Sequence, residues 1–127
     1  GKKSGDVAVA AGSGVEIDGL SVTSTPLRRG DGTFGATLCT KVTYTNGGSS
    51  TENYGMFDFE LQDPKGAIVN PSFFGGGDNL GTGDLAPGGT VTGDVCFEDK
   101  ATAKGTYVVL FDPGFLADGR GAFINQR

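Results

Sequence analysis

Short segments in which apolar and polar residues alternate recur along this chain, and glycine-rich turn signals separate them. In 36–46, 55–63 and 90–98 the apolar side chains fall mainly on one face. Side chains of a strand point alternately to its two faces, so a period of two predicts strands with one buried face. The chain has 24 glycines in 127 residues, which suits frequent tight turns between short strands.

The turn signals predict about seven strands at intervals of roughly 8–12 residues, as in sandwich folds. No segment has the pattern of a long amphipathic helix. We therefore predict an all-β fold, a two-sheet antiparallel sandwich of immunoglobulin type, with an up-and-down barrel as the main alternative. Phe57, Phe59 and Leu61 are expected to face the core. The expected strands are 15–24, 36–46, 55–63, 67–74, 90–98, 106–112 and 122–125.

The first 14 residues differ in composition from the rest of the chain. They are small and polar, GKKSGDVAVAAGSG, which is typical of a tether or a frayed end. We predict a flexible N-terminal linker at 1–14 and one sandwich domain at 15–127, although Val7 and Val9 could instead form an edge strand. No stretch approaches the roughly 18 apolar residues of a membrane span.

Two cysteines, Cys39 and Cys96, give the best indication of the compartment. Neither belongs to a CxxC motif, and the chain has no His, so a Cys/His zinc site is excluded. Each is out of phase with the apolar residues of its strand, and the two strands, second and fifth in order, are antiparallel neighbours in the immunoglobulin arrangement. We predict a structural cross-strand disulfide on the outer face of one sheet, which indicates an oxidising compartment. Two buried free thiols in a cytosolic protein are the alternative.

The absence of His also excludes most catalytic groups. No Ser–His or Cys–His nucleophile can be built, and few soft ligands remain for copper or zinc. Asp58 and Glu60 share a strand face and could form an acid–base pair, but the solvated face of an antiparallel sheet normally carries such residues. We predict a non-enzymatic protein without a cofactor. The formal charge of −5 argues against nucleic acid as a partner.

A glycine-rich acidic loop at 75–84 is a candidate metal site. Asp78, Asn79 and Asp84 offer oxygen ligands to calcium, but their spacing does not match an EF-hand loop. Local hydrogen bonds of turn residues are the alternative reading.

Two pairs of neighbouring residues are candidates for partner binding. Phe73 and Phe74 point to opposite sides of a strand, so one of them could be exposed and anchor a partner, whereas the alternative places both rings in the core. Arg28 and Arg29 could bind a carboxylate or phosphate group, or lie on a solvated loop.

Three segments resemble a known family: 57–66 (FDFELQDPKG), 85–98 (LAPGGTVTGDVCFE) and 107–115 (YVVLFDPGF). They look like the telokin-like immunoglobulin domains of bacterial secreted proteins and lipoproteins, which are similar to the mycobacterial immunoprotective extracellular antigen. The resemblance implies a sandwich outside the cytoplasm. Many relatives are anchored by a lipid on an N-terminal Cys before a polar linker; residues 1–14 suit such a linker, but this chain does not contain that Cys. The resemblance transfers no functional residue.

Together these observations predict a non-enzymatic, extracytoplasmic binding or structural module of the bacterial cell envelope, either secreted or a cell-surface lipoprotein. Its partner would be a protein or another envelope component. A small-ligand or calcium-binding domain that uses the loop at 75–84 is the alternative. A hydrolase that uses Asp58 and Glu60 is the third hypothesis.

Overall fold

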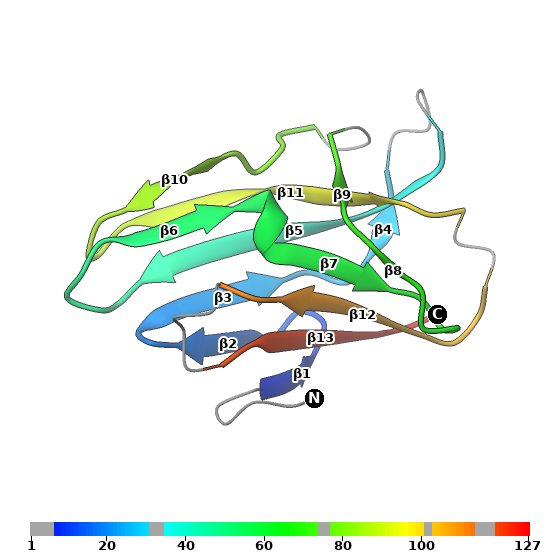
Figure 1. Cartoon of the computed structure of the whole chain (residues 1–127), viewed down its shortest axis with the longest axis horizontal. Helices are drawn as coiled ribbons and strands as arrows, with labels where there is room; N and C mark the ends of the chain where they lie inside the picture. Colours follow the sequence, from blue (N-terminus) through cyan, green and yellow to red (C-terminus); the bar gives the residue numbers. More distant parts are fainter. Residues whose placement is uncertain (1–6, 31–34, 74–76, 101–102, 114–118) are drawn as a thin grey trace.

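Two sheets pack against each other in the computed structural model, which describes residues 7–30, 35–73, 77–100, 103–113 and 119–127 (Figure 1). Strands account for nearly all the regular structure of these residues, and the predicted β-sandwich is confirmed. The exception is a single 3₁₀ turn, η1 (Met56–Asp58). Among the described residues, no helix has the length and hydrophobicity needed to cross a membrane.

The first sheet has five strands in the order β1-β13-β12-β7-β8. Its neighbours are antiparallel, except that β1 pairs with β13 in parallel. The strands are β1 (Val7–Ala10), β13 (Gly121–Gln126), β12 (Thr106–Phe111), β7 (Phe59–Gln62) and β8 (Ile68–Val69).

The second sheet has the order β2-β3-β5-β11-β9, and β4 also pairs with β5. Its centre is the long antiparallel pair β5 and β11, which lie side by side in Figure 1. A short antiparallel pair, β6 (Glu52–Gly55) and β10 (Thr82–Leu85), forms a separate two-stranded sheet. The strands of the second sheet are β2 (Gly14–Ile17), β3 (Leu20–Ser24), β4 (Arg28–Arg29), β5 (Thr37–Asn46), β11 (Thr90–Glu98) and β9 (Pro71–Ser72).

Aromatic rings from both sheets meet in the core. Tyr44 of β5 packs edge-on against Phe59 of β7 and Phe111 of β12, with ring centroids 6.0 and 5.8 Å apart. All three side chains are fully buried. The single proton of the Tyr44 hydroxyl is shared between the Asp58 carboxylate (2.8 Å) and the Gly55 carbonyl (3.3 Å), so the polar end of this ring is satisfied.

The segment expected as a single strand at 15–24 is a hairpin. Strands β2 and β3 are joined by Asp18 and Gly19, whose φ angles are 54° and 82°. Two consecutive positive φ angles at an Asp-Gly pair form the tight turn that suits the twist of a β-hairpin. The prediction of one continuous strand was therefore wrong.

The segment expected as a strand at 55–63 also differs from its prediction. It begins at the end of β6, turns through η1 and continues as β7. The turn rotates Phe57 out of the core, leaving it 58% exposed, while Met56 is buried in its place. Phe59 and Leu61 are fully buried as predicted, but the prediction that Phe57 faces the core was wrong.

At the start of the chain, Val7–Ala10 forms the edge strand β1, which the sequence allowed as an alternative to a linker. Residues 1–6 lie outside the described part of the chain, so a linker remains a prediction there.

Candidate functional site

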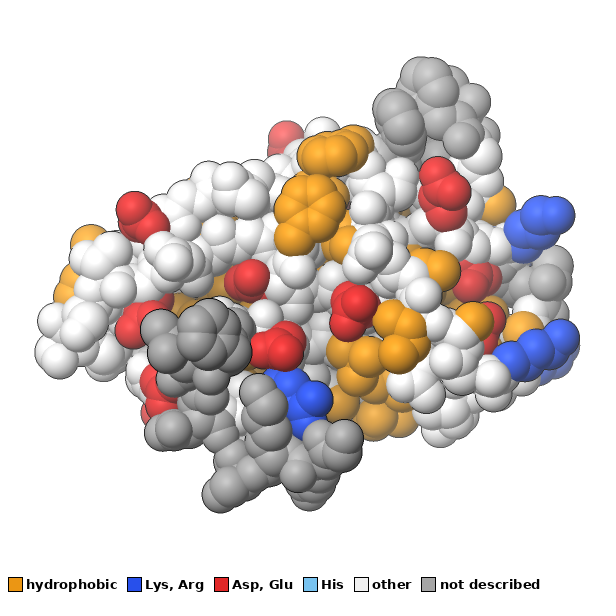
Figure 2. Space-filling model, viewed as in Figure 1, with side chains coloured by type: hydrophobic (Ala, Val, Ile, Leu, Met, Phe, Trp, Pro, Cys, Tyr) orange, Lys and Arg blue, Asp and Glu red, His pale blue; other side chains and the backbone are white. Residues whose placement is uncertain are grey.

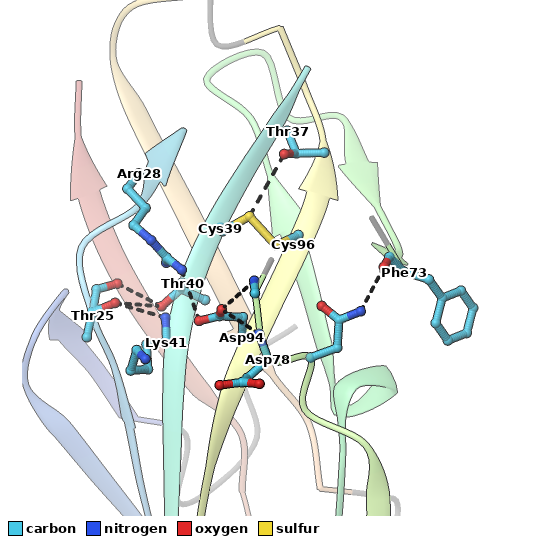
Figure 3. The surroundings of a disulfide bond; sticks show 12 residues. Thr25, Arg28, Thr37, Cys39, Thr40, Lys41, Phe73, Asp78, Asp94 and Cys96 are labelled. Atoms are coloured by element: carbon cyan, nitrogen blue, oxygen red, sulfur yellow. Dashed lines mark hydrogen bonds and ion pairs between the residues drawn. A yellow bond between two sulfur atoms is a disulfide. The ribbon is translucent and has the colours of Figure 1, made fainter. Parts of the chain in front are cut away.

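The Cys39–Cys96 disulfide joins β5 to β11, as predicted (Figure 3). The two residues lie directly opposite each other in the antiparallel register, with Cα atoms 4.0 Å apart. Both are on the face away from Leu38 and Phe97, yet both are fully buried. Strands β4 and β9 flank them, because Cys39 also pairs with Arg28 and Cys96 with Ser72.

Asp94 of β11 holds two neighbouring segments in place. Its carboxylate accepts a hydrogen bond from the Arg28 guanidinium (2.9 Å) and others from the backbone N–H groups of Gly77 (3.1 Å) and Asp78 (3.4 Å) (Figure 3). Burial alone would raise the pKa of Asp94, but the hydrogen bonds and the charge of Arg28 outweigh it and hold this pKa below its usual value. Arg28 therefore forms an ion pair with buried Asp94 although its own side chain is 45% exposed, and Arg29 is exposed beside it.

Within the described part of the acidic loop, residues 78–80 make backbone contacts to β11. Asn79 forms a bridge with Asp94 and donates a side-chain hydrogen bond to the Phe73 carbonyl at 2.7 Å. Asp84 belongs to β10, opposite Asn53 of β6. Within the part of the chain that the structure describes, no three acidic or cysteine side chains are grouped so as to hold a metal ion.

The two carboxyl groups considered as an acid–base pair, Asp58 and Glu60, lie in different environments. Asp58 lies in η1 and accepts the hydrogen bond from buried Tyr44. Burial raises the pKa of Asp58, the Tyr44 hydrogen bond opposes this, and the charge of Asp112 raises it further. Glu60 is exposed in β7, between buried Phe59 and Leu61.

Two phenylalanine rings form an exposed pair, which we call the aromatic surface. Phe57 of η1 is 58% exposed and Phe73, directly after β9, is 63% exposed. Their ring centroids are 5.8 Å apart with an interplanar angle of 72°, an edge-to-face contact. Figure 2 shows hydrophobic side chains gathered over η1 and β9, and in Figure 3 the Phe73 ring points away from the β5–β11 pair. Phe74 lies outside the described residues.

An open groove of about 460 Å³ adjoins the aromatic surface. Strand β8 pairs with β7 in the first sheet, whereas β9 pairs with β11 in the second, so the chain crosses between the sheets here (Figure 1). Pro71 suits this place because it has no N–H to donate and is tolerated on an edge strand. The groove is lined by Val69, Asn70, Pro71, Ser72, Phe73 and Glu98.

The residues predicted to bind partners are not all brought together. Phe73 follows β9, beside β11, while Arg28 and Arg29 lie in β4, beside β5, so the two groups flank opposite sides of the β5–β11 pair.

Sequence reasoning missed two residues of the site, Phe57 and Glu98. The adjacent apolar residues Met56 and Phe57 indicated that one of the two must point away from the core of a strand, but not which one.

The fold and this site define a disulfide-linked immunoglobulin-like sandwich with an aromatic surface beside a groove. The chain belongs to the family described as Domain of unknown function (DUF4352), which matches residues 12–121. The family resemblance predicted from the sequence is confirmed. None of the curated proteins matches the sequence.

Several solved structures share the fold. The yjhA protein of Bacillus subtilis is 26% identical, with a TM-score of 0.65 over 86% of this chain and 83% of that one. The predicted lipoprotein ycdA of the same organism is 15% identical, with a TM-score of 0.73 over 93% of this chain but 39% of its own. The secreted protein MPT63 of Mycobacterium tuberculosis is 13% identical, with a TM-score of 0.66 over 94% and 96% of the two chains.

Proposed function

We propose that this chain is an extracytoplasmic module of the bacterial cell envelope that binds a protein or another envelope component through the aromatic surface, without catalysing a reaction. The location is supported by the disulfide, since disulfides persist in oxidising compartments. It is also supported by the fold neighbours, which include a secreted protein and a predicted lipoprotein.

The observation that carries the binding role is the exposure of Phe57 and Phe73. Single exposed apolar residues are common on proteins, but a paired aromatic cluster beside a groove is typical of a contact site. Aromatic anchors contribute most of the energy in many interfaces because they bury a large area with few rotatable bonds. Phe57 lies in η1, and Phe73 directly follows β9, which pairs with β11, so the contact between the two rings joins segments that are far apart in the sequence.

The environments of the two candidate carboxyl groups support the non-catalytic part of the proposal. Asp58 accepts a hydrogen bond from buried Tyr44, and Glu60 is an exposed residue of β7. An acid–base pair must face one substrate from both sides at a defined separation. The arrangement of these two carboxyl groups supports a structural role for Asp58 and a solvent-facing one for Glu60.

A photo-crosslinking experiment tests the proposal. Phe73 is replaced by p-benzoylphenylalanine and the protein is irradiated with envelope fractions of the source bacterium. The matched control carries the same group at Val7, which is 37% exposed in β1 at the opposite edge of the first sheet from β8. We expect a discrete crosslinked product at position 73 only. Excess unlabelled protein should abolish it, but excess Phe57→Ser protein should not.

Identical products from positions 73 and 7, or none at either, would contradict a specific contact at the aromatic surface. Turnover of an envelope substrate that a single substitution of Asp58 or Glu60 abolishes would contradict the non-catalytic role.

A further inference from the structure

The charges around the aromatic surface indicate the chemistry of the partner. We propose that the aromatic surface and its groove bind a cationic polypeptide segment, in which the stem of a Lys or Arg lies along Phe73 and Pro71 and its charged end reaches Glu98. This inference rests on the proposed function, because it names the class of partner for the same surface.

Glu98 is the charged residue of the groove. The other lining residues are apolar or uncharged. Glu98 is exposed at the end of β11, and it forms no ion pair with any residue that the structure describes. An apolar wall that ends at an unpaired carboxylate matches a long basic side chain, whose methylene stem packs on apolar surface while its charged end stays in water.

The surface around the aromatic surface and its groove is also negatively charged, like Glu98. Figure 2 shows several acidic side chains around the hydrophobic cluster over η1 and β9, while the basic side chains visible on this face lie away from it. Arg28 is already paired with Asp94 on the far side of the β5–β11 pair. With a formal charge of −5, the molecule attracts a cationic partner and repels an anionic one.

The ring pair adds a second point of recognition. The edge-to-face contact leaves ring surface of Phe57 and Phe73 open to solvent, as their exposures of 58% and 63% require. The face of an aromatic ring attracts a Lys or Arg cation, and it also packs against an apolar side chain. A segment that carries both basic and apolar residues therefore satisfies the surface better than one that carries either alone.

Selection from a displayed library of random peptides tests this inference without assuming a partner, because an extended peptide can dock through its side chains. The bait is the whole disulfide-bonded protein. We expect the selected sequences to be enriched in Lys and Arg together with apolar residues. Binding of the selected peptides, measured by fluorescence anisotropy, should weaken at high salt because screening reduces the charge term.

Two matched pairs of variants locate the binding. Glu98→Lys should weaken the selected peptides about tenfold, as loss and reversal of a facing charge does. Glu16→Lys makes the same change in net charge at exposed Glu16 of β2, at the opposite edge of the sheet from β9, and should weaken them less than about twofold. Phe73→Ala should also weaken them about tenfold, as loss of an aromatic anchor does, whereas Val7→Ala should have no effect.

Three results would overturn the inference: selected peptides with no excess of basic residues, equal losses from Glu98→Lys and Glu16→Lys, or binding that survives Phe73→Ala. A concentration-dependent dimer that Phe73→Ala disrupts would also overturn it, because the occupant would then be a second copy of this acidic chain. If the peptides fail but crosslinking at position 73 still captures a discrete envelope product, the proposed function stands and only the cationic class is wrong.

Discussion

Among the glycines that the structure describes, Gly93 of β11 leaves the least room for a Cβ atom, because the loop before β10 lies directly against it. A Cβ atom there would lie 2.6 Å from the Cα and 2.8 Å from the backbone N of Leu80. We expect Gly93→Ala to lower the free energy of unfolding by about 1–3 kcal/mol, because backbone must move to relieve the overlap. Gly81→Ala is the control, since its Cβ would meet no atom within 4 Å. Equal urea midpoints for the two variants would contradict this account.

Asp94 should make stability depend on pH in the acid range. Its pKa is held below the unfolded value, so its ionised form stabilises the fold above that value, and this contribution is lost as the pH falls through the folded pKa. We expect Asp94→Asn to cost about 1–3 kcal/mol at neutral pH, as loss of a charged hydrogen-bond acceptor does. Melting temperatures measured at neutral and acid pH should show this difference shrinking on acidification; a constant difference would count against it.

Asp58 should make stability depend on pH in the opposite direction from Asp94. Its pKa is raised, so the folded state loses stability as the pH rises from the unfolded pKa through the folded one. Asparagine at this position keeps an oxygen that can accept the Tyr44 hydroxyl but carries no charge. We expect Asp58→Asn to melt at or above the wild-type temperature at neutral pH and to match it at low pH. A neutral-pH loss as large as that of Asp94→Asn would show that the charge of Asp58 stabilises the fold.

At the scale of single residues, the sequence predicted the phase of a strand better than the end of one. The faces of β5 and β11 are as expected, including the outward direction of Cys39 and Cys96. Phe57 was misplaced because alternation continues smoothly through it, while the 3₁₀ turn that rotates it outward depends on contacts with distant residues, such as the Tyr44 hydroxyl. Exposure of Phe57 could not be predicted from local pattern alone.

At the scale of elements, the disulfide reinforces a pairing that backbone hydrogen bonds already make. Strands β5 and β11 pair over nine registered positions, Thr37–Thr45 with Thr90–Glu98. We expect the double variant Cys39→Ala/Cys96→Ala to fold but to lose up to about 4 kcal/mol, the chain-entropy value for the 57-residue separation. Urea unfolding with and without a reductant checks this. Reductant should destabilise the wild type and leave the double variant unchanged, and a wild type that ignores full reduction would contradict it.

Elements with strong local signals were predicted well, and those fixed by distant contacts were not. Strand β11 has the bounds expected from its alternation, 90–98. The short strands β4, β8 and β9 have two residues each, too few for a period to be read, and their pairing depends on where the long strands already lie. The division of 67–74 between two sheets, which creates the groove, is of this kind.

At the scale of the whole molecule, binding to the native state must raise the melting temperature, and this separates the calcium hypothesis from the binding-surface hypothesis. Calcium needs six or more oxygen ligands around one point, whereas the described residues hold no group of three acidic side chains that could bind a metal ion, and Asp84 belongs to β10. We therefore expect millimolar calcium to leave the melting temperature unchanged relative to the same ionic strength of sodium chloride. A calcium-specific rise that Asp84→Asn abolishes, while Asp63→Asn in the separate 63–66 turn does not, would instead assign the 75–84 loop as a metal site. In that case the aromatic surface would no longer be the leading explanation of what this sandwich binds.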